Sequence, residues 1–171
     1  MHLKAHIQEL VAILQREIKS FTALLELLII EEKGLIDCDN YLLIDVLGRQ
    51  EDVLSSIACL EKSREDVIGR IAAQLGLDAA ALTVSRISGY IDDPLRRELQ
   101  ETAHVLTEIN ENLKRKKVTN THLIRQGAFM VENNLRYLLK ASGREPMTRG
   151  TYAADARRGG VTGSIGVDGR V

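Results

Sequence analysis

Apolar residues spaced three or four positions apart run along most of the first 140 residues of this chain. This spacing places side chains on one face of an α-helix, whereas a half-buried strand requires alternation with a period of two. The 171 residues contain two prolines, Pro94 and Pro146, so helices tens of residues long are permitted. Aromatic residues are 4% of the chain and tryptophan is absent, which leaves aliphatic side chains to build a core. The pattern predicts an all-α protein, an elongated antiparallel bundle of three long helices with a short connecting helix.

The first predicted helix extends from His2 to about Glu32. Its apolar stripe advances in steps of three and four with one irregularity, close to a coiled-coil seam. Further apolar residues widen the stripe near its end, so we expect that end to be more deeply buried. The stripe contains Leu3, Ile7, Leu10, Leu14, Ile18, Phe21, Leu25 and Leu28, and the widening residues are Leu24, Leu27, Ile29 and Ile30.

The polar segment around Asp39 separates the first helix from a second. Gly34 indicates a break, and Asp39 or Asn40 is suited to cap the next helix. The apolar stripe then continues from Tyr41 to Leu75. Gly76 follows in the position of a C-cap glycine.

A connection and a long last helix follow. Asp78 is suited to cap a short helix, which leads into a connection rich in Ser and Gly up to Ile91. Acidic residues before Pro94 are typical of a helix start, and the apolar stripe then predicts a helix to about Ser142. Gly143 and Pro146 end it.

The middle of the last helix departs from the apolar pattern. If Leu106 and Leu113 are seam positions, a strict heptad repeat places Asn110, Lys117 and Asn120 on the same seam. Two interpretations remain open, because the middle of the helix either faces water or forms a polar segment that faces a partner.

Residues 143–171 differ in composition from the rest. They contain seven glycines and five arginines and show no apolar periodicity. Such a segment cannot bury enough surface to offset the entropy of ordering. We therefore predict a helical domain over residues 1–142 and a flexible tail over residues 143–171.

Charge and composition exclude several classes of protein. The 23 basic and 24 acidic side chains sum to −1, so no overall field favours nucleic acid or an anionic membrane. No apolar stretch approaches the roughly 18 residues of a membrane span, and the N-terminus is charged and amphipathic. Cys38 and Cys59 lack partners at metal-binding spacing and are interpreted as reduced thiols. We expect a cytoplasmic protein without a membrane span.

Catalytic and cofactor motifs are weak or missing. Nucleotide-binding and hydrolase motifs do not occur in the sequence. Glu101 and His104 have the ExxH spacing of one half of a di-iron site, but no second ExxH accompanies them. The basic run from Lys114 to Lys117 points all round its helix, which favours a solvated stretch over a nucleic-acid site. We expect neither enzymatic activity nor a metal or other cofactor.

The order of these features resembles the FlgN family of flagellar type III export chaperones. The resemblance covers the whole chain and begins with the leucine-rich first helix. It continues through LGRQEDVLSSIACLEKSREDVI (Leu47 to Ile68), the connection LDAAALTVSRISGYI, NENLKRKKVTNTHLI (Asn110 to Ile124) in the long last helix and the TY of the tail (Thr151 and Tyr152).

The resemblance implies a role in protein export. Such a chaperone binds the C-terminal helices of the hook-filament junction proteins, also called hook-associated proteins, keeps them unassembled and delivers them to the export gate. The family's Asn and Leu pattern corresponds to Asn120, Leu123 and Ile124, and its gate-docking tyrosine corresponds to Tyr152. The glycine that often follows that tyrosine is replaced here by the segment from Ala153 to Arg158.

Three long helices leave room for a client helix as a fourth, recognised through anchors at helical spacing. The expected partner-binding residues on the last helix are Leu106, Asn110, Leu113, Asn120, Leu123, Ile124, Val131 and Leu135. The alternative interpretation is a self-associating coiled-coil scaffold, in which the same stripes pair with a second copy. For the chaperone we expect a monomer or a weak homo-oligomer.

Overall fold

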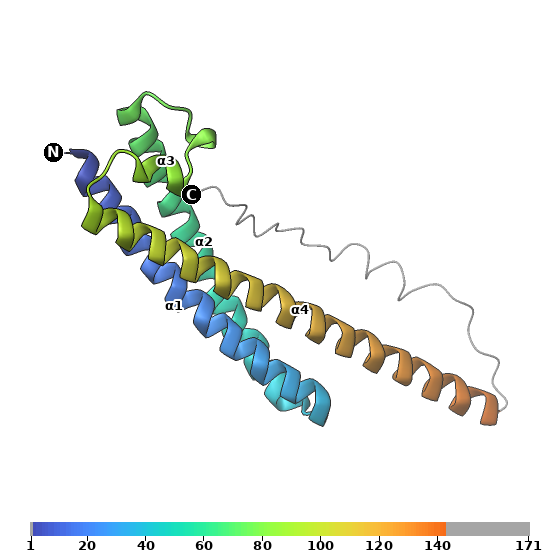
Figure 1. The fold of residues 1–171 in the computed structure, drawn as a ribbon. Coiled ribbons are helices and arrows are strands. Elements are labelled where there is room, and N and C mark those ends of the chain that lie inside the picture. The colour runs from blue at the N-terminus through green and yellow to red at the C-terminus, as the bar shows by residue number, and fades with distance from the viewer. Residues whose placement is uncertain (1, 143–171) are drawn as a thin grey trace. The chain divides into compact units, whose positions relative to one another are not determined.

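The computed structural model describes residues 2–142, and the long elements are all helical (Figure 1). The elements are α1 (His2–Asp37), α2 (Asn40–Leu75), the 3-10 helix η1 (Ala79–Ala81), α3 (Val84–Ser88) and α4 (Asp93–Ala141). The all-α prediction with three long helices is therefore confirmed. The predicted tail, 143–171, lies outside the described residues.

The described residues form two compact units. The first ends at Thr121, and the second starts at His122 and contains the C-terminal part of α4. The division therefore falls inside one helix. The predicted division at residue 142 stays a prediction.

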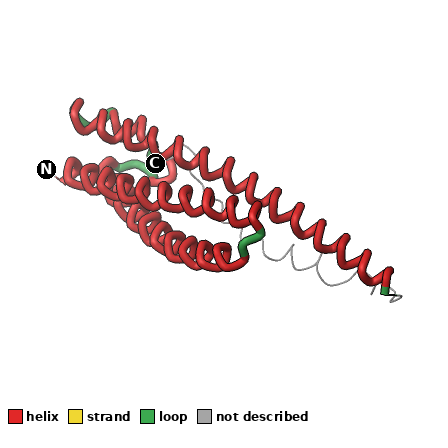
Figure 2. The backbone as a smooth tube through the Cα atoms, turned by 90° about the horizontal axis from the view of Figure 1, so that it is seen from below, coloured by secondary structure: helices red, strands yellow, loops and turns green. Residues whose placement is uncertain are grey.

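Helices α1 and α2 form an antiparallel hairpin within the first unit (Figure 2). The side chain of Arg70 hydrogen-bonds that of Glu9 near the start of α1, and the side chain of Gln50 hydrogen-bonds that of Glu31 near its end. The two helices therefore run in opposite directions. Asp39 is the N-cap of α2, as predicted, and its carboxylate accepts a hydrogen bond from the Leu42 N–H at 3.0 Å. This bond satisfies one of the free amides at the helix start.

Gly34 does not end α1, contrary to the expected break, since the helix continues to Asp37. A Cβ added at Gly34 would lie 3.0 Å from Leu43 Cδ2, so the missing side chain permits close approach of α1 and α2. The helix ends instead at Cys38, whose φ of 54° is left-handed. The Asp39 N–H bonds the Gly34 carbonyl at 2.9 Å, which is the six-to-one bond of a Schellman motif.

The connection between α2 and α4 is more ordered than its composition indicates. Gly76 caps α2 with a φ of 65°, as predicted. Asp78 caps η1, and Thr83 caps α3, a helix that the Ser and Gly content did not predict. Leu82 and Ile87 within this connection are both 0% exposed, so burial of apolar side chains holds the segment in place.

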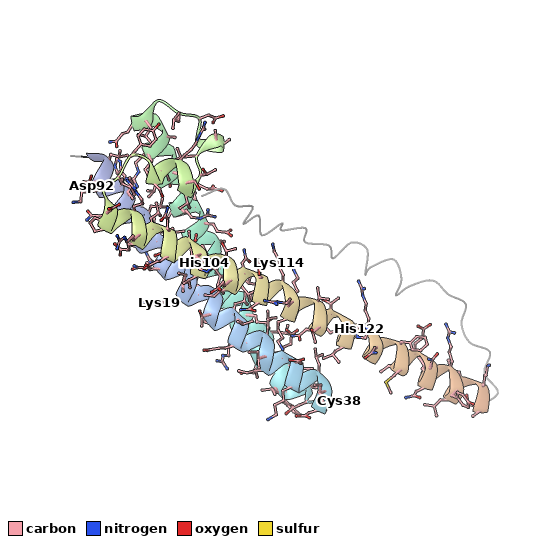
Figure 3. All side chains as sticks on the ribbon, viewed as in Figure 1. Lys19, Cys38, Asp92, His104, Lys114 and His122 are labelled. Atoms are coloured by element: carbon pink, nitrogen blue, oxygen red, sulfur yellow. The ribbon has the colours of Figure 1, made fainter. Side chains whose placement is uncertain are left out.

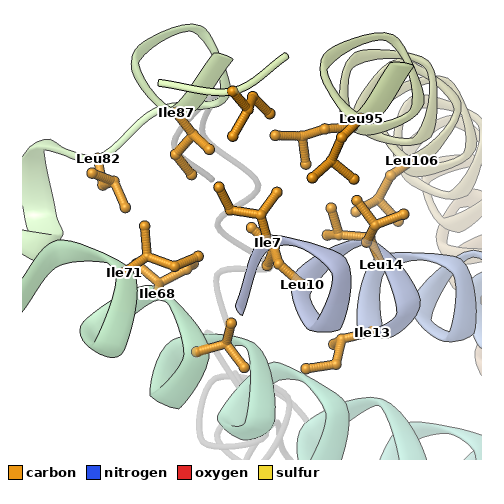
Figure 4. Packing of buried hydrophobic residues seen from close by; sticks show 14 of the residues in the cluster. Ile7, Leu10, Ile13, Leu14, Ile68, Ile71, Leu82, Ile87, Leu95 and Leu106 are labelled. Carbon is orange, nitrogen blue, oxygen red and sulfur yellow. The ribbon is translucent and has the colours of Figure 1, made fainter. Parts of the chain in front are cut away.

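Helix α4 runs parallel to α1 within the first unit. Gln15 of α1 hydrogen-bonds Glu98 near the start of α4, and Leu28, further along α1, accepts a hydrogen bond from the Asn120 amide, further along α4. The two helices therefore run in the same direction. The core is aliphatic at this end of the unit. Figure 4 shows Ile7, Leu10 and Leu14 of α1 surrounded by Ile68 and Ile71 of α2, Leu82 and Ile87 of the connection, and Leu95 and Leu106 of α4.

The expectation that the end of α1 is more deeply buried holds for Leu24 and Leu27 but is wrong for Ile29, which is 50% exposed. Ile29 lies two residues from Glu31, which faces α2 and α4, and is therefore on the opposite side of the helix. Among residues 2–142, none of the helices combines the length and apolar content needed to cross a bilayer.

Candidate partner-binding surface

The second unit presents an amphipathic helix whose apolar face is exposed. Ile124, Ala128, Val131, Leu135 and Leu138 advance in steps of four, three, four and three, so they share one face of α4. The exposed fractions are 49% for Ile124, 68% for Val131, 54% for Leu135 and 67% for Leu138. We call this set the C-terminal seam; in Figure 3 it lies beyond the labelled His122.

Three more residues widen this face. Leu123, Met130 and Tyr137 are seven positions apart and lie beside the seam. Met130 and Tyr137 are 64% and 81% exposed, and Leu123 is partly buried. Methionine adapts its shape to different partners, and tyrosine adds a large contact area with a polar end. The wide face can therefore accept an apolar helix.

The remaining face of the same segment is mostly polar and basic, with one exposed aromatic residue, Phe129, which is 64% exposed. Arg125, Arg136 and Lys140 stand against one acid, Glu132, between His122 and Ala141. Glu132 and Arg136 form an ion pair one helical turn apart. The combination of an exposed apolar face and a solvated polar face is typical of a helix that binds another helix.

The predicted partner-binding residues divide between the two units. Leu106, Asn110, Leu113 and Asn120 belong to the first unit and are 5%, 3%, 4% and 3% exposed. Helix packing inside the first unit already covers these side chains. Leu123, Ile124, Val131 and Leu135 lie in the second unit, where a partner can reach them.

Asn120 belongs to a buried polar layer that joins all three long helices. Its amide nitrogen donates to Leu28 O of α1 at 2.8 Å and to Glu31 Oε2 at 2.9 Å. Gln50 of α2 donates to the same Glu31 oxygen at 3.1 Å. Nearby, Lys116 of α4 forms an ion pair with Glu32 of α1. The Asn120 Oδ1 atom is buried without a hydrogen-bond partner, but the contacts that the three helices share at Glu31 Oε2 fix helix register.

Asn110 is different, because neither of its amide atoms has a hydrogen-bond partner although both are buried. Asn110 and Asn120 face the protein's own interior in the structure, whereas Lys117, the third polar position of the same seam, is exposed to solvent.

An open hollow of about 480 Å³ lies between α1 and α2 in the first unit. It is lined by Arg16, Lys19, Ser20, Ser55, Ser56, Cys59, Leu60 and Ser63. Six of the eight lining residues carry a charge or a hydroxyl group, in contrast to the row of aliphatic side chains in the C-terminal seam.

Sequence reasoning missed Met130, Tyr137 and Leu138 as surface residues of the site. The seven-residue spacing from Leu123 and the seam spacing from Leu135 could have indicated them. Tyr152 lies outside the described residues.

The ExxH residues form no metal site in the described chain. Glu101 and His104 are both exposed, and His104 lies 3.6 Å from Glu108. Within residues 2–142, no group of three or more His, Cys, Asp or Glu side chains is arranged to hold a metal ion.

A helical bundle whose described residues include an amphipathic helix with an exposed apolar face is typical of the class of proteins that bind other polypeptides. The family model described as FlgN protein matches residues 1–158, and the chain belongs to the FlgN family. This is a family of flagellar export chaperones that bind flagellar proteins, and not a family of enzymes. The resemblance seen in the sequence is confirmed. A search of curated proteins and a search of solved structures each found no match.

Proposed function

We propose that this protein is an export chaperone that binds the C-terminal helices of hook-filament junction proteins on the C-terminal seam. It keeps these clients unassembled in the cytoplasm and delivers them to the type III export gate. Membership of the FlgN family supports the class of function. The exposed seam from Ile124 to Leu138 supports the location of the binding surface.

The chemistry of the seam suits a helical client. An amphipathic client helix places anchors at i, i+3, i+4 and i+7, which match the steps of Ile124, Val131, Leu135 and Leu138. Burying each such side chain fully contributes about 1.5 to 3 kcal/mol. A client that covers the seam shields its own apolar face at the same time, so it cannot pair with other subunits.

Delivery to the gate is assigned to Tyr152. This residue corresponds to the family's tail tyrosine and stands among small and polar residues. An aromatic side chain in such a context is suited to anchor in a partner's pocket.

The test measures binding of purified full-length protein to peptides from the C-terminal helices of the junction proteins of the same organism. Leu135→Glu places a carboxylate in the centre of the seam and should weaken binding about tenfold or more. Because Leu135 is 54% exposed, its replacement should leave the helical content unchanged. Circular dichroism checks this point.

His122→Glu is the matched control. It adds the same carboxylate at an exposed position whose neighbours one turn further on, Arg125 and Gln126, belong neither to the seam nor to the residues that widen it, so it should not change affinity. Failure of the wild-type protein to bind any junction-protein helix would refute the proposed function. Equal loss in both variants would indicate a general charge effect and refute the seam as the site.

A further inference from the structure

The hollow between α1 and α2 has the size of a small-molecule site but not the usual lining. Its volume of about 480 Å³ lies within the roughly 300 to 1,000 Å³ that such sites occupy. The walls of such sites are mostly apolar. Among the described residues that line this hollow, Leu60 alone is aliphatic, and none has a carboxylate. The hollow therefore favours a polar ligand.

The α1 wall of the hollow supplies two positive charges. Arg16, Lys19 and Ser20 are spaced i, i+3 and i+4, so they lie on the same side of the helix. The positions three and four residues before and after Arg16 and Lys19 hold no Asp or Glu. Within residues 2–142, neither side chain forms an ion pair. Like charges one turn apart repel each other, and an anion bound beside both would offset this repulsion.

The nearest carboxylates in the sequence do not neutralise this wall. Glu17 follows Arg16 directly, but its side chain is 1% exposed and is paired with Arg64 inside the hairpin. On α2, Asp52 and Glu61 lie within one turn of lining residues without lining the hollow themselves. The two cations of the α1 wall therefore define the charge of the hollow.

The α2 wall supplies hydroxyl groups. Ser56 and Ser63 donate their hydroxyl hydrogens to backbone carbonyls one turn earlier, at 3.1 and 2.9 Å. Ser55 of α2 and Ser20 of α1 also line the hollow, and in the part of the chain that the structure describes their hydroxyls form no hydrogen bond with another residue. These two hydroxyls can donate to a ligand, so donors are available on both walls.

We propose that this hollow binds a small anion that carries phosphate groups and at least two negative charges. Arg16 offers paired N–H donors that match two phosphate oxygens, and Lys19 adds a second charge. Ser20 and Ser55 donate further hydrogen bonds from the two walls. The donors on α1 lie within about one helical turn, roughly 6 Å, which fits a compact ligand better than an extended polypeptide. None of the described lining residues is aromatic, so the site recognises phosphate groups and not a nucleobase.

A ligand held by both walls stabilises the hairpin. It binds the folded protein and not the unfolded chain, so the temperature of thermal unfolding should rise with ligand concentration. The hollow shares no residue with the C-terminal seam, and the inference does not rest on the proposed function.

The experiment titrates the purified full-length protein with inorganic phosphate, pyrophosphate and tripolyphosphate in a phosphate-free buffer, and calorimetry measures the dissociation constants. Affinity should increase with the charge of the anion and decrease with added salt. Arg16→Gln and Lys19→Gln should each raise the dissociation constant for pyrophosphate about tenfold. Ser55→Ala should raise it about fivefold. All three positions are exposed, so the helical content should not change, and circular dichroism checks this point.

Lys4→Gln is the matched control. Lys4 is an exposed cation on the same helix, about 18 Å from Arg16, which is beyond the screening length at physiological salt. Its replacement should leave the dissociation constant unchanged. Equal weakening in this control would show a general attraction of anions and refute the hollow as the site.

Two further results would overturn the inference. One is a wild-type protein that binds none of the three anions at millimolar concentration. The other is tighter binding of a glutamate-rich peptide than of tripolyphosphate, which would assign the hollow to an acidic polypeptide. Binding of junction-protein helices should be unchanged in Arg16→Gln and Lys19→Gln, so failure of the anion site and failure of the proposed function are read from separate measurements.

Discussion

Glu17 of α1 and Arg64 of α2 form an ion pair inside the helical hairpin, with Arg64 Nε 3.0 Å from Glu17 Oε1. The Glu17 side chain is 1% exposed and that of Arg64 is 15% exposed. Burial raises the pKa of Glu17 above its ordinary value of 4.5, and the Arg64 guanidinium partly offsets this effect. A raised pKa means that the folded state binds this proton more tightly than the unfolded chain does.

Arg64→Met should destabilise the protein by about 3 kcal/mol at pH 7, because it leaves a buried carboxylate without its partner. Arg70→Met is the control, since Arg70 and Glu9 form an exposed pair between the same two helices and should contribute less than about 1 kcal/mol. Urea unfolding of both variants provides the comparison.

The pH dependence follows from the direction of the Glu17 shift. The stability that this group contributes is fully present below pH 4.5 and decreases as pH rises through the raised pKa of the folded state. Removing Arg64 raises that pKa further. The difference between Arg64→Met and the wild type should therefore shrink on acidification, and a constant difference would contradict the role assigned to this pair.

Cys38→Gly should stabilise the protein by about 1 kcal/mol, because a residue with a Cβ at a φ of 54° is strained and glycine is not. Gly76 occupies the same left-handed conformation at the end of α2, so Gly76→Ala should destabilise by a similar amount. Thermal unfolding of the two variants should show shifts of opposite sign. Destabilisation by Cys38→Gly would show that the cysteine side chain itself is needed at the turn.

Asn120→Ala should destabilise the protein by about 2 kcal/mol, because it removes the hydrogen bonds to Leu28 and Glu31. Asn110→Leu should instead stabilise by about 1 kcal/mol, since this buried amide has no partner to lose. Chemical denaturation measures the free energy of unfolding of both variants. A loss of stability in Asn110→Leu would indicate that its amide has a partner, such as a buried water.

Tyr152→Ala should leave the helical fold and client affinity unchanged and reduce secretion of the client proteins. Client affinity is measured with the same peptides as above, and secretion is measured in cells that produce only the variant. Loss of client affinity would place Tyr152 in client binding and refute its assignment to the export gate.

Much of the fold could be predicted from the sequence because its signals are local. The Asp39 cap, the Gly76 cap and the start of α4 near Pro94 each depend on residues within one or two helical turns. Helix α3 was missed because the five residues between Thr83 and Gly89 carry little periodicity, and it forms where Ile87 is buried in the core.

The candidate site could be predicted only in part. One apolar stripe continues along α4 from Leu95 to Leu138, and nothing in that pattern separates covered positions from exposed ones. The pattern therefore predicts Leu106 and Leu113 as partner-binding residues on the same grounds as Val131 and Leu135. In the structure, the first two are buried in the first unit, and the last two are more than half exposed.

The sequence by itself determined the three long helices, the caps at Asp39 and Gly76 and the start of α4, because these features depend on neighbours a few positions away. Only the tertiary structure decided which part of the α4 stripe is covered. That outcome depends on contacts such as the one between Asn120 and Leu28, which are 92 positions apart, and local periodicity carries no information at that range. The same long-range packing left the C-terminal seam exposed among the residues that the structure describes in its unit, up to Ser142.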